Sequence, residues 1–238
     1  AILCAWHAGQ EGGNSVADVL SGAASPSGKL TMTFPVAFAD AASSANFPID
    51  QKVNIDITNS DSGNGNVKNV DFTEYQEDIY VGYRYFDSFG KDVSYPFGYG
   101  LSYTTFEYSA PAVSLANDVV TVTVDIANKG AVAGKEIVEV YAKAPYAKDA
   151  NKPEHELKGF AKTKVLNPGE KQTLTVEFHT ADLASFNEEA SAWVVDGGKY
   201  EIQIGASSRD IRATLEVEVA AADKQVSNVL VPQVEINR

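Results

Sequence analysis

Alternation of apolar and polar residues in the second half of the chain constrains its fold more than any other sequence feature. Four runs carry an apolar residue at every second position: Val120, Val122, Val124 and Ile126; Leu174, Val176 and Phe178; Tyr200, Ile202 and Ile204; and Ile211, Ala213, Leu215, Val217 and Val219. A period of two places all the apolar side chains of a run on one face of a strand. The runs therefore predict strands with one buried and one solvated face.

Turn signals separate these runs at residues 128–130 (NKG), 167–169 (NPG) and 196–198 (DGG). About seven short strands in roughly a hundred residues are typical of an antiparallel sandwich of the immunoglobulin type. We assign this sandwich to residues 106–220. The tail, residues 221–238, carries another apolar alternation that could dock on the body or fray, at Val229, Val231 and Val234.

The first hundred residues have a mixed character. Residues 1–6 form an apolar run that predicts a buried strand, so Cys4 within it is expected to be a buried, inert thiol. Asn14 is expected to cap a short helix that ends before Gly22. Three apolar side chains fall on one face of that helix: Val16, Val19 and Leu20. The run opens without a preceding turn or cap and without a signal peptide, which suggests a fragment that begins upstream.

A second strand is predicted over residues 29–34, where apolar and polar residues alternate before Pro35. The order strand, helix, strand is typical of an α/β layer. Residues 78–103 are dense in aromatic side chains and are interpreted as a packed, extended segment that crosses between the two modules. Within this segment, Arg84 is expected to pair with a nearby carboxylate: Glu74, Glu77 or Asp78.

Composition excludes several functions. The net charge of −13 disfavours nucleic acid, whose binding depends on Lys and Arg, and it disfavours anionic membrane surfaces. No stretch is long enough to span a bilayer, whereas a neutral sugar would not be repelled. The histidines (His7, His155 and His179) lack metal-ligand spacing, and Asn59, Asp61 and Asn64 lack the spacing of a calcium loop. We therefore expect no metal and no cofactor.

Several short motifs together resemble family 3 glycoside hydrolases. They lie in that family's order along nearly the whole chain: residues 5–14 (AWHAGQEGGN), 26–35 (PSGKLTMTFP), 81–87 (VGYRYFD), 95–106 (YPFGYGLSYTTF), 156–160 (ELKGF), 167–170 (NPGE) and 204–208 (IGASS). The resemblance implies a complete enzyme with a TIM-like barrel, an α/β sandwich and a fibronectin type III-like domain. On that basis residues 1–105 are the end of the α/β sandwich with its exit segment, and residues 106–220 are the fibronectin type III-like domain.

The resemblance also implies a function. The complete enzyme would be a retaining, exo-acting β-glucosidase, periplasmic or extracellular, with β-linked gluco-oligosaccharides as substrates and the missing barrel as partner. Its nucleophile Asp and acid/base Glu would lie in missing segments, so no catalytic residue is expected in this chain. The isolated chain would then be inactive, and a homodimer remains open.

Three residues of the first turn are candidates for lining the cleft: Trp6, Gln10 and Glu11. Glu11 lies where a strand ends and a helix begins, a common ligand position in open α/β sheets. The helix N-terminus would keep it ionised, which suits hydrogen bonding better than acid catalysis. The alternative for Glu11 is that it caps the helix and braces the domain interface, and the alternative for Trp6 is that it packs in the core. For the whole chain, the alternatives are a structural or carbohydrate-contacting module, or part of a β-xylosidase-type enzyme.

Overall fold

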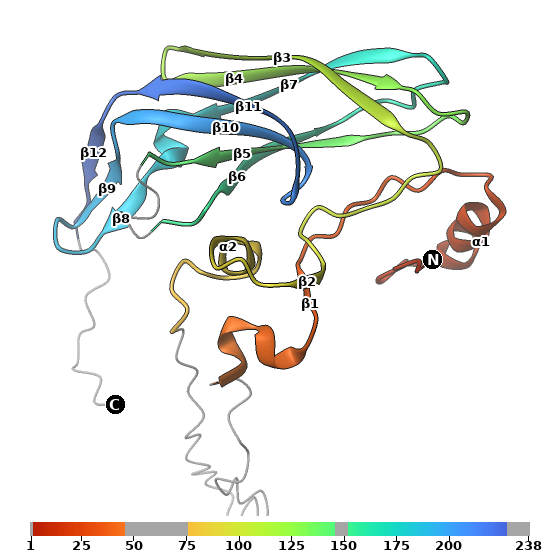
Figure 1. Ribbon diagram of the computed structural model, residues 1–238, viewed down its shortest axis with the longest axis horizontal. Coiled ribbons are helices and arrows are strands. Elements are labelled where there is room, and N and C mark those ends of the chain that lie inside the picture. Colours follow the sequence, from red (N-terminus) through yellow and green to blue (C-terminus); the bar gives the residue numbers. More distant parts are fainter. Residues whose placement is uncertain (1, 46–75, 146–151, 228–238) are drawn as a thin grey trace, which may run out of the picture.

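The computed structural model describes residues 2–45, 76–145 and 152–227 (Figure 1). The first part of the chain forms α1 (Gly12–Ser21), β1 (Phe34–Pro35), the 3-10 helices η1 (Phe38–Asp40) and η2 (Ala42–Ala45), α2 (Tyr83–Ser88) and β2 (Val93–Tyr95). The second part forms β3 (Phe106–Ala116), β4 (Val119–Asn128), β5 (Ile137–Lys143), β6 (Glu156–Lys162), β7 (Lys171–His179), η4 (Thr180–Leu183), β8 (Ser185–Asn187), β9 (Ala192–Val195), β10 (Gly198–Ser207), β11 (Asp210–Val219) and β12 (Ala222–Gln225).

The second part is an antiparallel two-sheet sandwich, which confirms the predicted fold class. One sheet has the strand order β3-β4-β7 and the other has the order β11-β10-β5-β6. The four alternating runs of the sequence are β4, β7, β10 and β11, and their apolar side chains meet between the sheets. A third, small sheet with the order β12-β9-β8 lies at the end of the sandwich that is far from α1 (Figure 1).

The core forms because alternate residues of both sheets point inward. Its members include Val120, Val122, Val124, Ile126, Val138, Val140, Leu174, Val176, Phe178, Tyr200, Ile202 and Ile204, together with Leu166 from a loop. Burying one such side chain contributes roughly 1.5–3 kcal/mol, so a dozen of them favour one register strongly over a shift by one residue.

A buried asparagine closes the turn after β4. Asn128 is fully buried and accepts hydrogen bonds from Thr104 Oγ1 at 2.6 Å and from the Gly130 amide at 3.0 Å. Its amide nitrogen donates to the carbonyl oxygens of Val132 and Leu166, each at 2.8 Å. The side chain thus joins three segments, including the stretch that enters β3.

Residues 2–6 correct the first sequence prediction. They form no strand; Ile2 is 81% exposed and Cys4 is exposed rather than buried. The second expected strand, over residues 29–34, is reduced to β1, which pairs with β2. Leu30 also exchanges backbone hydrogen bonds of 2.8 Å with Tyr99 and Gly98, but this contact does not continue as a strand ladder.

Helix α1 exists as predicted, but its start differs. The N-cap residue is Glu11, and Asn14 lies inside the first turn instead of capping it. Gly22 follows the helix in the left-handed conformation with φ of +80°, as the sequence indicated. The expected apolar face is only partly covered, because Val16 and Val19 are half-buried while Leu20 is 70% exposed.

The aromatic segment over residues 78–103 is not simply extended, because α2 interrupts it. Arg84 pairs with Glu156 at 3.2 Å and not with the carboxylates close to it in sequence. Glu74, the loop with Asn59, and the tail with Val229 lie outside the described residues. None of the helices in the described part of the chain combines the length and apolar composition needed to cross a bilayer.

Candidate functional site

The three sequence candidates lie together in the loop before α1. Trp6 is 55% exposed, and its ring meets Phe34 edge-on at 6.3 Å between centroids. Gln10 is exposed in the turn that leads into α1. Glu11 is also exposed, and its Oε2 accepts a hydrogen bond from Asn14 Nδ2 at 2.7 Å. The loop presents polar groups and one aromatic ring to solvent.

This loop is suited to contacting a ligand rather than to acid–base chemistry by itself. A retaining glycoside hydrolase needs two carboxyl groups about 5 Å apart. The hydrogen bond of Glu11 joins it to an amide, and this bond also ties the side chain to the first turn of α1. Cleft lining by Trp6, Gln10 and Glu11 therefore stays a prediction. Glu11 occupies the N-cap position of α1, but its side chain makes no capping hydrogen bond to a backbone amide and contacts the Asn14 side chain instead.

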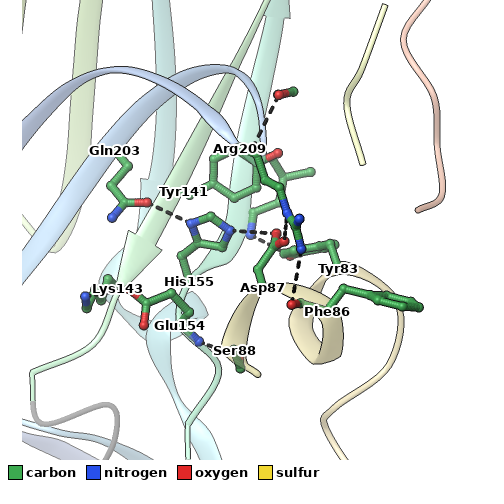
Figure 2. A network of polar contacts seen from close by, with 12 residues as sticks. Tyr83, Phe86, Asp87, Ser88, Tyr141, Lys143, Glu154, His155, Gln203 and Arg209 are labelled. Atoms are coloured by element: carbon green, nitrogen blue, oxygen red, sulfur yellow. Dashed lines mark hydrogen bonds and ion pairs between the residues drawn. The ribbon is translucent and has the colours of Figure 1, made fainter. Parts of the chain in front are cut away.

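The most developed arrangement of side chains lies where the first part of the chain packs on the sandwich (Figure 2). Helix α2 covers the outer face of β5 and the start of β6. The Tyr141 ring stacks on His155 with centroids 4.6 Å apart, and Tyr83 lies 5.9 Å from both rings. Tyr83 also packs on Phe97 at 4.8 Å. Aromatic side chains from both parts of the chain therefore form one interdomain cluster.

An ion pair fixes this joint. Arg209, in the turn between β10 and β11, donates from Nε to Asp87 Oδ1 of α2 at 2.6 Å. Its NH2 group donates to the carbonyl oxygens of Phe86 at 3.2 Å and Lys91 at 2.7 Å. One guanidinium thus holds the C-terminal half of α2 and the residues that follow it.

A buried histidine completes the network. His155 Nε2 lies 3.3 Å from Asp87 Oδ2, and its Nδ1 lies 2.7 Å from Gln203 Oε1 (Figure 2). Burial acts to raise the pKa of Asp87, but the hydrogen bonds from His155 and Arg209 outweigh it and leave that pKa below its usual range. Asp87 is therefore held as a carboxylate at neutral pH.

A second buried carboxylate lies nearby on the same sheet face. Glu139 accepts a hydrogen bond from the Tyr141 hydroxyl at 2.5 Å and is 4% exposed. Burial raises the pKa of Glu139 above its usual range. Gly98 packs directly on it, since a Cβ placed there would lie 2.1 Å from Glu139 Oε2.

Lys29 anchors the first part of the chain beside this carboxylate. Its Nζ donates to the Ala206 carbonyl at 3.0 Å and pairs with Glu136 at 3.1 Å.

The network is a structural joint, and sequence reasoning found only part of it. The density of aromatic residues over 78–103 correctly indicated interdomain packing. His155 is a buried histidine with a polar partner at each ring nitrogen. The pairing of Asp87 with Arg209 was missed because 122 positions separate them and no local pattern marks either residue. In the described part of the chain, no group of three His, Cys, Asp or Glu side chains could hold a metal ion.

Comparison with known proteins adds the following findings. Residues 1–103 match the model of the glycosyl hydrolase family 3 C-terminal domain, and residues 136–208 match that of a fibronectin type III-like domain. The chain is 42% identical over 225 residues to beta-glucosidase B of Emericella nidulans, covering 93% of this chain and 25% of the relative. An exo-alpha-(1->6)-L-arabinopyranosidase of Bifidobacterium longum is 40% identical over 217 residues, or 91% of this chain and 26% of the relative.

Solved structures give the same result. The structure of beta-glucosidase 3B from Thermotoga neapolitana in complex with alpha-D-glucose has a TM-score of 0.81 and 45% sequence identity, with 93% of this chain and 28% of that chain covered. The beta-glucosidase from Kluyveromyces marxianus in complex with glucose has a TM-score of 0.79 and 37% identity, covering 92% and 24%. The chain thus spans about a quarter of the length of the curated relatives it matches.

Proposed function

Because this chain belongs to glycosyl hydrolase family 3, we propose that it forms part of a β-glucosidase that releases terminal, non-reducing β-D-glucosyl residues from oligosaccharides. The observation that carries this proposal is the succession of the two domains in one chain, in the arrangement shared with β-glucosidases at 37–45% identity. The reaction would be exo-acting and proceed with retention of configuration.

The chain's own share in this reaction would be to complete the cleft and hold its wall in place. The catalytic nucleophile and acid/base carboxylates would belong to a barrel and to the remainder of the α/β sandwich. The exposed loop with Trp6, Gln10 and Glu11 would line the cleft, where the ring can pack on a sugar face and the polar groups can bind hydroxyls. The joint around Asp87 and Arg209 would fix this wall to the sandwich.

Further parts of the proposal concern the surroundings of the enzyme. We propose that the substrates are β-linked gluco-oligosaccharides, that the complete protein works in the periplasm or outside the cell, and that it assembles as a homodimer. A neutral substrate is compatible with a net charge of −13, which would repel polyanions.

A second specificity is supported by one finding. Two relatives that are 40% identical to this chain are exo-alpha-(1->6)-L-arabinopyranosidases. An α-L-arabinopyranoside has the configuration of a β-D-galactopyranoside without its hydroxymethyl group, so it differs from a β-D-glucoside at C4 and C5. The same fragment could serve an enzyme with either specificity.

The proposal is tested by hydrolysis of p-nitrophenyl β-D-glucoside and p-nitrophenyl α-L-arabinopyranoside. The complete polypeptide that carries this chain is expected to hydrolyse the glucoside, and the 238-residue chain alone is expected to be inactive. Absence of activity in the complete polypeptide on both substrates would refute the enzyme proposal. Turnover by the chain alone that disappears in Glu11→Gln would instead place a catalytic carboxylate in the loop before α1.

A further inference from the structure

Two aromatic rings lie exposed side by side on the small sheet at the far end of the sandwich. Phe186 of β8 is the direct cross-strand partner of Trp193 of β9, and both side chains are 47% exposed. Their centroids are 5.3 Å apart and the rings meet at 61°, so they form a corner instead of a flat patch. Val195, two positions further along β9, is buried in the sandwich core and anchors the strand while the rings face solvent.

Polar groups surround this corner. Lys224 of β12 is the cross-strand partner of Trp193 on its other side and is exposed. A hollow of about 310 Å³ adjoins Phe186 and is lined by Asn187, Glu188 and Glu189. Its wall also contains the ion pair of Lys152 with Asp196. The hollow meets the corner at Phe186 only, since Val194 and not Trp193 lines it. It offers an amide, carboxylates and an ammonium group that can donate and accept hydrogen bonds.

The chemistry of this corner favours a neutral sugar over other occupants. The carbon-bound hydrogens of a pyranose ring form an apolar face that packs on an aromatic ring, while its hydroxyl groups bind polar side chains at the edge. Exposed carboxylates at Glu188 and Glu189, in a chain with a net charge of −13, would repel anionic polymers and lipid surfaces.

We propose that Phe186 and Trp193 form a surface binding site for β-linked glucan chains, separate from the loop before α1. Figure 1 places β8 and β9 at the end of the sandwich opposite α1, so a glucan held here would not occupy the same place as a sugar at Glu11. The site would retain the enzyme on polymeric material while terminal glucosyl units are released elsewhere. The choice of glucan as ligand rests on the proposed function, whereas the corner itself does not.

Retention on insoluble β-glucan and affinity electrophoresis in soluble β-glucan test this site with the full chain. Trp193→Ala and Phe186→Ala are each expected to weaken retention at least about tenfold. Phe160→Ala is the matched control, because Phe160 is a single aromatic side chain on β6 that is 68% exposed. Its loss is expected to leave retention unchanged. Circular dichroism of each variant confirms that the sandwich is folded.

Fluorescence gives a second measurement that does not depend on polymer retention. The chain has two tryptophans, so Trp6→Phe leaves Trp193 as the single tryptophan reporter. Titration of this variant with cello-oligosaccharides is expected to shift and saturate its emission. The same titration of Trp193→Phe, which retains Trp6, reports any sugar binding at the loop before α1.

Three outcomes would overturn the proposal. The first is that the wild-type chain is not retained on β-glucan. The second is that Trp193→Ala is retained as well as wild type. The third is that the chain binds no glucan but self-associates through this face, seen as a concentration-dependent increase in mass that Trp193→Ala abolishes. Hydrolysis of p-nitrophenyl β-D-glucoside by the complete polypeptide is expected to be unchanged in Trp193→Ala. Failure of the binding site and failure of the proposed function are therefore separable.

Discussion

Replacing Arg209 by Met is expected to loosen the joint between the two parts of the chain. Asp87 is 7% exposed and would lose its ion pair, and the carbonyl oxygens of Phe86 and Lys91 would lose a donor. Breaking a buried ion pair costs about 3–5 kcal/mol when one charge is left unpaired. Arg209 is one-third exposed and His155 still contacts Asp87, so we expect a loss of roughly 2–4 kcal/mol.

Urea unfolding followed by tryptophan fluorescence measures this loss in each part separately. In a Trp193→Phe background the remaining Trp6 reports the first part of the chain, and in a Trp6→Phe background Trp193 reports the sandwich. Arg209→Met is expected to lower the free energy of unfolding sensed by Trp6 more than that sensed by Trp193, because the sandwich core does not involve Arg209.

The control is Arg212→Met, three positions along the same hairpin. Arg212 pairs with Asp210, with both side chains more than 40% exposed, and its guanidinium lies 5.5 Å from the centre of the Tyr108 ring, so its loss should cost about 1 kcal/mol. The pH dependence gives a further check. The pKa of Asp87 is lowered in the folded state, so its contribution is present at neutral pH and disappears as pH falls below about 4. Equal effects of Arg209→Met and Arg212→Met at pH 7 would refute the reasoning.

Three further predictions concern neighbouring groups. Gly98→Ala should destabilise the chain by about 1–3 kcal/mol in thermal unfolding, because φ is +79° and the new Cβ would collide with Glu139. The control is Gly13→Ala, whose new Cβ would have no atom within 4 Å. Glu139→Gln should be more stable than wild type at pH 7, because the pKa of Glu139 is raised in the folded state and its stabilising, protonated form is lost as pH rises. In urea titrations the difference in free energy of unfolding should vanish near pH 4. A difference that stays constant with pH would contradict this. Asn128→Ala should cost about 2–5 kcal/mol because four hydrogen bonds are broken, two of them buried and two part-buried. An unchanged urea midpoint would exclude this role for the side chain.

The sandwich could be predicted because its determinants are local. In β4 and β7 the alternation of apolar and polar residues is visible within each strand, and the turn at Asn128 follows directly. Strand β10 shows the limit of this reasoning, since alternation suggested a wet outer face whereas Gln203 on that face is buried. The side chain that contacts Gln203 there is His155, 48 positions earlier in the chain, and a pattern within one strand carries no information about it.

In the first part of the chain, the sequence pattern did not show which side chains are buried or which charged groups pair. An apolar run over residues 2–6 indicates only that these side chains favour burial, and the structure leaves Ile2 and Trp6 exposed. Likewise, the sequence supplied Arg84 and several nearby acids but not the pairing with Glu156. For Arg84, proximity in sequence therefore did not identify the partner.

The sequence by itself determined the strand periodicity, the turns, the ordered family motifs and the position of helix α1, because each depends on the conformational preferences of a few adjacent residues. Tertiary structure decided which faces are covered, which carboxylates are buried, and how Asp87, His155 and Arg209 meet. These features depend on contacts between residues 48–122 positions apart. Only the complete packing fixes such contacts, because burial and pairing are properties of the assembled surfaces and not of any one segment.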